Sequence, residues 1–464
     1  MNSQSKVKIG VVPIKREFLS VENAIAQKER IFKKLKAIKP EEVELVNIDG
    51  LIENGVLWDD YESMKKVTDK MLEEKPDAIF MPHCDFGAEE AVRKIGKAMG
   101  VPVLLWGERD QAPVPNQPRP TDTQCGLFAS SKALQRMGVP FSYIVNSELD
   151  SDKFVNGFNK FAAAASVVKS FRKLRIAQVS LRPKPFMSVI YNEDEILSRF
   201  GIEVVPVSAA YVKKVMDRYL KEKSSLVDET VEEFNKRINC SETDKEKQRK
   251  IAALKLALAE IIRENECDSA ALECWTLFSR YMDFKPCLVV GELTDMGIPV
   301  SCETDVLGAV SSVMLKAAAF GKKPTFFADL TLRHPQNDNA ELLWHCGPFP
   351  YSLKASESEA KLVNAMENWS LKKGEITIAR FDGMQGRYSL FSGEGRAVEG
   401  PDTTGTYVWL EVDNLDKWEE KIINGPYIHH VSGIYGNYSE ILNEACKYIP
   451  GVDADGMKQY GTSL

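Results

Sequence analysis

The chain contains few imidazole groups, and two acidic residues in the same half of the sequence follow apolar segments. Five histidines occur in 464 residues, and three of them are His345, His429 and His430. Glu303 and Asp329 each come shortly after a predicted buried strand. A carboxylate placed there is costly unless it faces a cleft, a partner or a metal ion. Two carboxylates with one or two imidazoles would form a mixed site that suits Mn²⁺, Fe²⁺, Co²⁺ or Zn²⁺ better than Ca²⁺.

Each of these residues also has an ordinary structural interpretation. An acid at a strand end is commonly a helix cap or an ion-pair partner, and Thr304 or Asp305 is placed to cap a helix that begins near Val306. His345 can be a partly buried histidine whose hydrogen bonds are satisfied. A His-His pair is weaker evidence than an HExxH motif, because neighbouring side chains need not converge. The residue types alone therefore leave both interpretations open.

Several other classes of function are disfavoured by the sequence. It contains no GxxxxGK[ST] loop, no GxGxxG after a strand and no GxSxG, which are the signatures of nucleotide-dependent enzymes and serine hydrolases. Sixty basic residues against 67 acidic ones give a formal charge of −7, so neither nucleic acid nor an anionic membrane is an expected partner.

The cysteines and the apolar runs indicate the compartment. Nine cysteines without a CxxC pair fit reduced thiols better than a secreted disulfide framework. No apolar run reaches the roughly 18 residues that a membrane-spanning helix needs, and the first residues lack the pattern of a signal peptide. We therefore expect a soluble, cytoplasmic protein with no membrane partner.

The elements that must position these side chains fall into three groups, as the length also suggests. Strands alternate with long helical patterns in the first two groups, which predicts parallel βαβ units whose ligands gather at the carboxyl ends of the strands. The polar stretch 211–266 predicts solvated helices that cover a sheet. The strands are expected at 7–12, 77–81, 101–106 and 141–145, and then at 176–180, 202–207, 269–273, 298–302 and 324–327.

After about residue 350 glycine, threonine and aromatic residues become frequent. The alternating segments 374–380 and 405–412 predict a mainly antiparallel β domain. The expected fold class is α/β, with two Rossmann-like parallel α/β domains followed by this β-rich domain. The expected domains are 1–172, 173–322 with Glu303, and 323–464 with Asp329, His345 and His430.

The order and spacing of these residues resemble the L-fucose isomerase and L-arabinose isomerase superfamily, in particular its fucose-isomerase-like branch. The resemblance is carried by Glu303 in Cys-Glu-Thr-Asp, Asp329 in Phe-Ala-Asp-Leu, His345 in Trp-His-Cys-Gly and His430 in Ile-His-His-Val. No single motif is diagnostic. The likeness covers most of the chain, because it extends to 81–87, 107–110, 123–126, 181–186 and 271–275.

The resemblance implies a role for each residue of the set. Glu303, Asp329 and His430 would bind the metal, and His429 would contact the substrate. His345 lies where arabinose isomerases have a further histidine ligand, a role that fucose isomerases lack, so it is either a ligand or a substrate contact. The resemblance also implies Mn²⁺ or another divalent transition metal as cofactor, and a homo-oligomer, either a trimer or a hexamer.

The implied reaction interconverts a free aldose and its ketose. A divalent cation on both sugar oxygens would stabilise the developing negative charge, and Glu303 and Asp329 would act as base and acid by a cis-enediol route. The chain is shorter than the best-known fucose isomerases. The expected substrate is therefore L-fucose, L-arabinose or a 6-substituted or deoxy hexose.

Four further side chains are candidate substrate contacts. Trp275 and Trp106 either stack on the sugar or belong to the core, and Arg109 and Arg182 either bind an anionic substituent or form ion pairs. Two other functions remain as alternatives. One is a non-catalytic sugar-binding protein on the same scaffold, and the other is a metal-dependent hydrolase or lyase.

Overall fold

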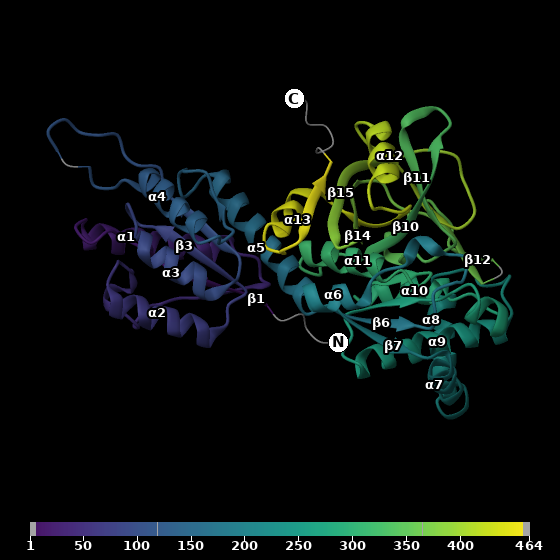
Figure 1. The fold of residues 1–464 in the computed structure, drawn as a ribbon. Helices are drawn as coiled ribbons and strands as arrows, with labels where there is room; N and C mark the ends of the chain where they lie inside the picture. Colours follow the sequence, from purple (N-terminus) through teal and green to yellow (C-terminus); the bar gives the residue numbers. More distant parts are fainter. Residues whose placement is uncertain (1–5, 118, 364, 458–464) are drawn as a thin grey trace. The chain divides into compact units, whose positions relative to one another are not determined.

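The computed structural model describes residues 6–117, 119–363 and 365–457, which form two compact units divided between Lys169 and Ser170 (Figure 1). No helix within these described ranges is both long enough and apolar enough to cross a membrane.

The N-terminal unit is built on a five-stranded parallel sheet with the order β2-β1-β3-β4-β5. Its three central strands, β1, β3 and β4, are almost wholly buried, because a parallel sheet carries helices on both faces. Helix α3 packs against α2 and α4. The strands are β1 (Val7–Val11), β2 (Val43–Val46), β3 (Ala78–His83), β4 (Val103–Gly107) and β5 (Ser142–Tyr143), and the helices are α1 (Val21–Ile38), α2 (Tyr61–Glu74), α3 (Glu89–Met99), α4 (Thr123–Arg136) and α5 (Asp152–Arg172).

The C-terminal unit begins with a four-stranded parallel sheet of order β7-β6-β8-β9. The polar stretch that predicted covering helices forms α7, α8 and α9, and their apolar residues face the core. The strands are β6 (Arg175–Val179), β7 (Glu203–Val207), β8 (Ser269–Leu272) and β9 (Val300–Cys302), and the helices are α6 (Glu193–Phe200), α7 (Ala209–Glu222), α8 (Ser224–Asn235), α9 (Lys245–Glu264), α10 (Cys287–Asp295) and α11 (Val306–Ala318).

The rest of this unit is a nine-stranded, mainly antiparallel sheet. Strand β16 pairs with both β11 and β15, so the strands β16-β11-β10-β17-β14-β15 close on themselves like a barrel. The strands are β10 (Thr325–His334), β11 (Asn337–His345), β12 (Lys361–Val363), β13 (Met366–Ser370), β14 (Glu375–Met384), β15 (Arg387–Val398), β16 (Thr406–Glu411), β17 (His430–Tyr435) and β18 (Val452–Gly456), with helices α12 (Leu415–Asn424) and α13 (Ser439–Cys446).

The parallel sheet and the barrel share one hydrophobic core, which continues from Val179 to Val431. Helix α11 lies between the two, because it packs against β8 and β9 on one side and β10, β14 and β17 on the other (Figure 1). Twelve of its thirteen residues are buried. A helix that is apolar on every face is one that other elements surround.

The expected mixed α/β class is confirmed, with two parallel sheets followed by an antiparallel one. The Rossmann-like detail and the three domain boundaries stay predictions. One strand differs from expectation. The segment 324–327 is the start of the ten-residue strand β10, which pairs with β11 and β17 of the barrel.

Gly126 fixes the approach of α4 to the segment after β3. A Cβ atom on Gly126 would lie 1.7 Å from the carbonyl oxygen of Phe86, a distance that only a backbone shift can relieve. We expect Gly126→Ala to lower the free energy of unfolding by about 1–3 kcal/mol through overpacking. Urea unfolding followed by circular dichroism measures this. Lys132→Ala, on an exposed position of the same helix, should leave stability unchanged, and equal stability of both variants would contradict the close approach.

Candidate active site

Glu303 lies in a strained turn between β9 and α11. Glu303 and Thr304 have φ values of 59° and 58°. This left-handed conformation costs a residue with a side chain roughly 1–2 kcal/mol. Such strain is typically kept at functional sites. The turn is fixed on both sides, because the Thr304 amide donates to the Leu272 carbonyl and Asp305 caps α11 through the amide of Gly308. The expected cap at Asp305 is thereby confirmed.

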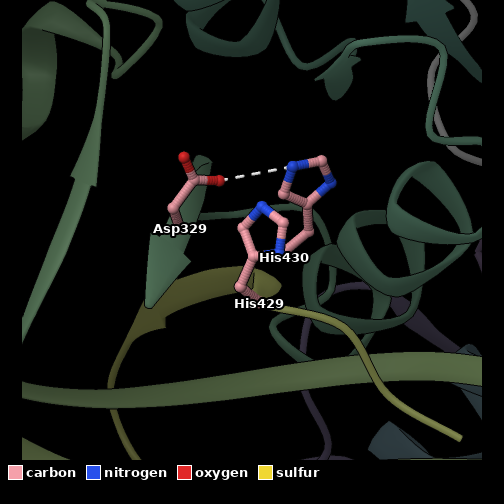
Figure 2. Close-up of side chains that lie close together, drawn as sticks. All are labelled: Asp329, His429 and His430. Atoms are coloured by element: carbon pink, nitrogen blue, oxygen red, sulfur yellow. Dashed lines mark ion pairs between the residues drawn. The ribbon is translucent and has the colours of Figure 1, made fainter. Parts of the chain in front are cut away.

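Asp329 and His430 face each other across two strands of the barrel. They are direct partners in the antiparallel pairing of β10 and β17, and direct partners place their side chains on the same face. Figure 2 shows the two side chains pointing toward one another, with His429 beside them. Nε2 of His430 lies 3.3 Å from Oδ1 of Asp329 and 3.0 Å from Oε2 of Glu303. The predicted trio of Glu303, Asp329 and His430 therefore converges on one point.

The other nitrogen of His430 is held by Asp305. Nδ1 of His430 lies 2.9 Å from Oδ2 of Asp305. Because this oxygen also accepts from Arg380 and belongs to an ionised carboxylate, Nδ1 is the donor. The hydrogen of the neutral ring then lies on Nδ1, and Nε2 keeps its lone pair. A carboxylate that orients a histidine in this way is the usual support for a metal-binding imidazole.

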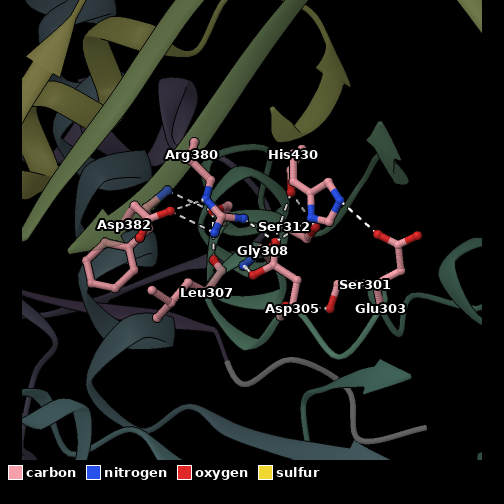
Figure 3. Close-up of polar contacts among 12 residues, drawn as sticks. Ser301, Glu303, Asp305, Leu307, Gly308, Ser312, Arg380, Asp382 and His430 are labelled. Atoms are coloured by element: carbon pink, nitrogen blue, oxygen red, sulfur yellow. Dashed lines mark hydrogen bonds and ion pairs between the residues drawn. The ribbon is translucent and has the colours of Figure 1, made fainter. Parts of the chain in front are cut away.

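Asp305 belongs to a chain of buried charges that runs back into the barrel. Figure 3 shows Arg380 between Asp305 and Asp382, with His430 beyond Asp305. The guanidinium bonds Asp305, and its Nε donates to Oδ2 of Asp382 at 2.8 Å. Burial acts to raise the pKa of Asp305, but the Arg380 guanidinium and His430 hold it well below its usual range. All three charged side chains are at least nine-tenths buried.

The ionisation of the two facing groups follows from the same contacts. Burial acts to raise the pKa of Glu303, but the imidazoles of His430 and His345 lower it below its ordinary value. Burial acts to lower the pKa of His430, but its bond to Asp305 raises it. Trp275 adds a neutral donor, since its Nε1 lies 2.7 Å from Oε1 of Glu303. Glu303 is therefore a carboxylate with one oxygen held in place.

Aromatic side chains form the wall around His430. Phe186 stacks on its ring at 5.2 Å between centroids and 25° between planes, and Phe327 meets it edge-on at 5.1 Å. Phe186 also contacts Trp275 and His429 edge-on. Trp275 remains 41% exposed. An apolar wall with one open face excludes water from the acids and leaves a ring surface for a ligand.

His345 joins this group but is held differently from His430. The backbone amide of Cys346 donates to Nδ1 of His345 at 2.9 Å, so Nδ1 must offer a lone pair and the hydrogen of the neutral ring lies on Nε2. Burial lowers the pKa of His345, but the charges of Asp329 and Cys346 raise it to about 10. The nearby negative charges therefore favour the protonated ring, and Nε2 carries a hydrogen in both the neutral and the protonated form.

The donor set at this point fits a metal ion. Oδ1 of Asp329 and the Nε2 atoms of His345 and His430 are buried and make no hydrogen bond within the described part of the chain. The ligand atoms of Asp329, His429 and His430 all lie within 4.8 Å of one another. Orphaned polar atoms are costly in an interior. A cation that takes nitrogen and oxygen ligands would bind the atoms of this set that carry a free lone pair.

The structure treats the four predicted substrate contacts differently. Trp275 borders the acids, whereas Nη1 of Arg182 donates to the carbonyl of Phe186 at 2.8 Å and braces the loop that carries the wall. Trp106 and Arg109 lie in the N-terminal unit. Arg109 is exposed there, but Trp106 is fully buried against Phe154, with Nε1 bonded to Ser147. The interpretation of Trp106 as a core residue therefore holds, because it has no exposed face for a sugar.

Comparisons with known proteins find relatives of this chain. A family model described as the N-terminal domain of fucose and sulfoquinovose isomerases matches residues 10–172. A sulfoquinovose isomerase of Priestia megaterium (strain ATCC 12872 / QMB1551) is 25% identical over 448 residues, which are 93% of this chain and 95% of that protein. A sulfoquinovose isomerase of Alkalicoccus urumqiensis is 25% identical over 339 residues, 70% of this chain and 73% of that protein. These matches support a place for this chain in the fucose-isomerase-like superfamily.

Sequence reasoning missed the residues that support the site. Asp305 was expected only as a helix cap, while Arg380, Asp382, Phe186 and Phe327 were not singled out. Asp382 follows Arg380 by two positions on β14, a spacing that places both on one face of a strand. This spacing was the one signal in the sequence, and it does not identify Asp305, the cap of α11, as the other partner of Arg380.

The buried charge chain predicts a large effect on stability. Asp305→Ala removes the cap of α11 and one of the two buried carboxylates that compensate Arg380, so we expect the free energy of unfolding to fall by about 3–5 kcal/mol. Urea unfolding monitored by circular dichroism measures the change. The matched control is Asp217→Ala, which breaks the largely exposed pair Lys213–Asp217 and should cost no more than about 0.5 kcal/mol. Exposed ion pairs contribute up to about 1 kcal/mol. A loss below about 1 kcal/mol for Asp305→Ala would therefore contradict the stabilising role of the buried charges.

Proposed function

We propose that this chain is a metal-dependent aldose–ketose isomerase whose substrate is a free hexose with an anionic substituent at C6. The observation that carries the proposal is the convergence of Glu303, Asp329 and the free Nε2 of His430 on one point. Its relatives named sulfoquinovose isomerases, which align over most of the chain, support an intramolecular oxidoreductase.

Glu303, Asp329 and His430 would hold the cation, with His429 beside them on the open side. Lewis-acid polarisation of the sugar carbonyl and the adjacent hydroxyl is the chemistry that Mn²⁺ or a similar ion would supply there. Asp305 serves this site by holding the hydrogen of His430 on Nδ1. The aromatic wall serves it by excluding water from the carboxylates.

The two carboxylates would carry the protons of the reaction. Isomerisation removes a proton from the carbon beside the carbonyl, returns one to the former carbonyl carbon, and moves a hydroxyl proton between the two oxygens. Glu303 has a lowered pKa and is ionised near neutral pH, so it can accept a proton from the sugar. Trp275 holds Oε1 of Glu303, which leaves Oε2 as the oxygen on the side of His430 and Asp329. Asp329 then acts as the partner acid or base in a cis-enediol route.

We assign His345 to the substrate rather than to the metal. A metal ligand needs a lone pair on the nitrogen that faces the ion, and the amide of Cys346 favours a hydrogen on Nε2 of His345. This hydrogen would be donated to a sugar oxygen or to Asp329, where it would stabilise negative charge that develops during enolisation. The two histidines would therefore have different roles.

The C6 substituent is proposed from the relatives, since sulfoquinovose is a hexose with a sulfonate at that carbon. Arg182 is engaged with carbonyl groups of its own loop, which makes it a poor candidate for the sulfonate in this state. A homo-oligomer, either a trimer or a hexamer, remains our proposal for the assembly and rests on the resemblance to the superfamily.

The first test is an NMR assay in D₂O with Mn²⁺ and a panel of free aldoses that includes deoxy, neutral and C6-sulfonated hexoses. We expect ketose formation with deuterium at the exchanged carbon, strongest for the sulfonated sugar, and its loss when a chelator is added. Exchange on neutral sugars alone would refute the anionic substrate. Cleavage products would indicate a hydrolase or lyase, and binding without exchange would indicate a sugar-binding protein.

Glu303→Gln tests the proposed base. The amide keeps the bond to Trp275 but cannot accept a carbon-bound proton, so we expect turnover and deuterium exchange to fall by about 10³-fold or more. The melting temperature should change little. Glu232→Gln, on the exposed face of α8, is the matched control and should retain full activity. Near-normal exchange in Glu303→Gln would refute the assignment.

The two histidines can be separated by comparing metal binding with turnover. We expect His430→Gln to weaken Mn²⁺ binding by at least about tenfold. His345→Leu should leave Mn²⁺ affinity within about twofold and lower kcat by roughly 10²-fold, because it removes a donor used during the reaction. Isothermal titration with Mn²⁺ and steady-state kinetics measure both quantities. Equal weakening of Mn²⁺ binding in the two variants would make His345 a ligand.

A further inference from the structure

Four of the nine cysteines gather directly behind the candidate active site. Cys274, Cys302 and Cys346 are each adjacent in sequence to a residue of the site, namely Trp275, Glu303 and His345. Cys302 is hydrogen-bonded to Cys274, and Cys346 contacts Cys287. The mechanism above uses none of these thiols.

The pair Cys287–Cys346 has the geometry closest to a disulfide. Its sulfur atoms lie 3.6 Å apart, and a disulfide requires about 2.0 Å. Cys287 is the first residue of α10 and is almost fully buried, whereas Cys346 follows β11 and is only partly buried. A small oxidant can therefore reach Cys346, and Cys287 is the neighbour that can then react with it.

Movement of Cys346 would be transmitted to His345. The amide of Cys346 donates to Nδ1 of His345 at 2.9 Å, and its sulfur lies 3.2 Å from the same nitrogen. On the other side the backbone is confined, because a Cβ at Gly347 would lie 2.8 Å from the amide nitrogen of Glu367. A closure of about 1.6 Å between the sulfurs draws the sulfur of Cys346 away from Nδ1 of His345 and pulls on the amide that orients the ring.

We infer that Cys287 and Cys346 are a redox-active pair whose disulfide switches the site off by misplacing His345. The oxidant is a hydroperoxide. The sulfur of Cys346 attacks the terminal peroxide oxygen, the O–O bond breaks, and a sulfenic acid and an alcohol form, or water when the oxidant is hydrogen peroxide. The sulfur of Cys287 then attacks the sulfur of the sulfenic acid, and the sulfenic oxygen leaves as water. The two thiols together lose two electrons and two protons, and the peroxide is reduced. The bond can form whatever the chain catalyses, whereas the loss of turnover rests on the proposed isomerase function.

The test treats the reduced full-length protein with hydrogen peroxide, blocks remaining thiols, and maps the peptides without reduction. We expect a linked peptide that joins Cys287 to Cys346, and a fall in isomerase activity of about tenfold or more that dithiothreitol reverses. Cys287→Ser should keep the basal activity but lose the linked peptide and the reversible inactivation. Cys287→Ala, checked by circular dichroism, repeats the test if the serine variant does not fold.

The exposed Cys125 provides the matched control, since Cys125→Ser should respond to peroxide like the parent protein. Absence of the Cys287–Cys346 peptide after peroxide treatment would overturn the proposal, and so would reversible inactivation that persists in the Cys287 variants. If the linked peptide forms while the untreated chain isomerises no sugar, the pair stands and the proposed function fails.

Discussion

The structure of the site depends on burying a charge chain at the N-terminal end of α11. Asp305, Arg380 and Asp382 have lost almost all contact with water, and each charge is compensated only by its neighbours and by His430. Removing two opposite charges from water costs several kcal/mol per ion, so such a chain is maintained only when its geometry is good. Helix α11 can provide that geometry because elements on every side hold it in place.

The same helix couples the two halves of the C-terminal unit. Its Ser311 accepts from the amide of Phe381 on β14, and Ser312 bonds Ser432 on β17. These contacts place the barrel strands against the turn that carries Glu303. Glu303 enters from the parallel sheet, and Asp329 and His430 enter from the barrel. A site assembled from both layers exists only when the two layers keep one relative position. Within the barrel, the antiparallel pairing of Asp329 with His430 fixes how these two side chains lie beside each other.

The sequence predicted site residues where a chemically reactive side chain follows a segment with clear strand periodicity. Glu303 and Asp329 could be predicted as site residues because a carboxylate after a buried strand is costly unless it faces a partner, a cleft or a metal ion. The family resemblance added His430 and implied a role for each residue. The support of His430 by Asp305 and Arg380 could not be predicted, because it joins positions 75 residues apart whose pairing is set by the barrel register. Trp106 shows a different limit, since its residue type was noticed but its role could not be decided from the sequence. Tryptophan suits a sugar face and a core equally well, and only its complete burial distinguishes the two.

In the proposed mechanism two histidines of equal intrinsic chemistry have different tasks because different groups contact their Nδ1 atoms. A carboxylate at that nitrogen makes His430 a lone-pair donor at Nε2, and a backbone amide there makes His345 a hydrogen donor at Nε2. The first arrangement is secured by buried ions, which resist small displacements because losing a partner leaves a charge unpaired. The second depends on one amide at the end of β11, next to a thiol 3.6 Å from another. Since an amide contact costs far less to break than a buried ion pair, a small backbone shift at His345 would alter the proposed chemistry without disturbing the fold.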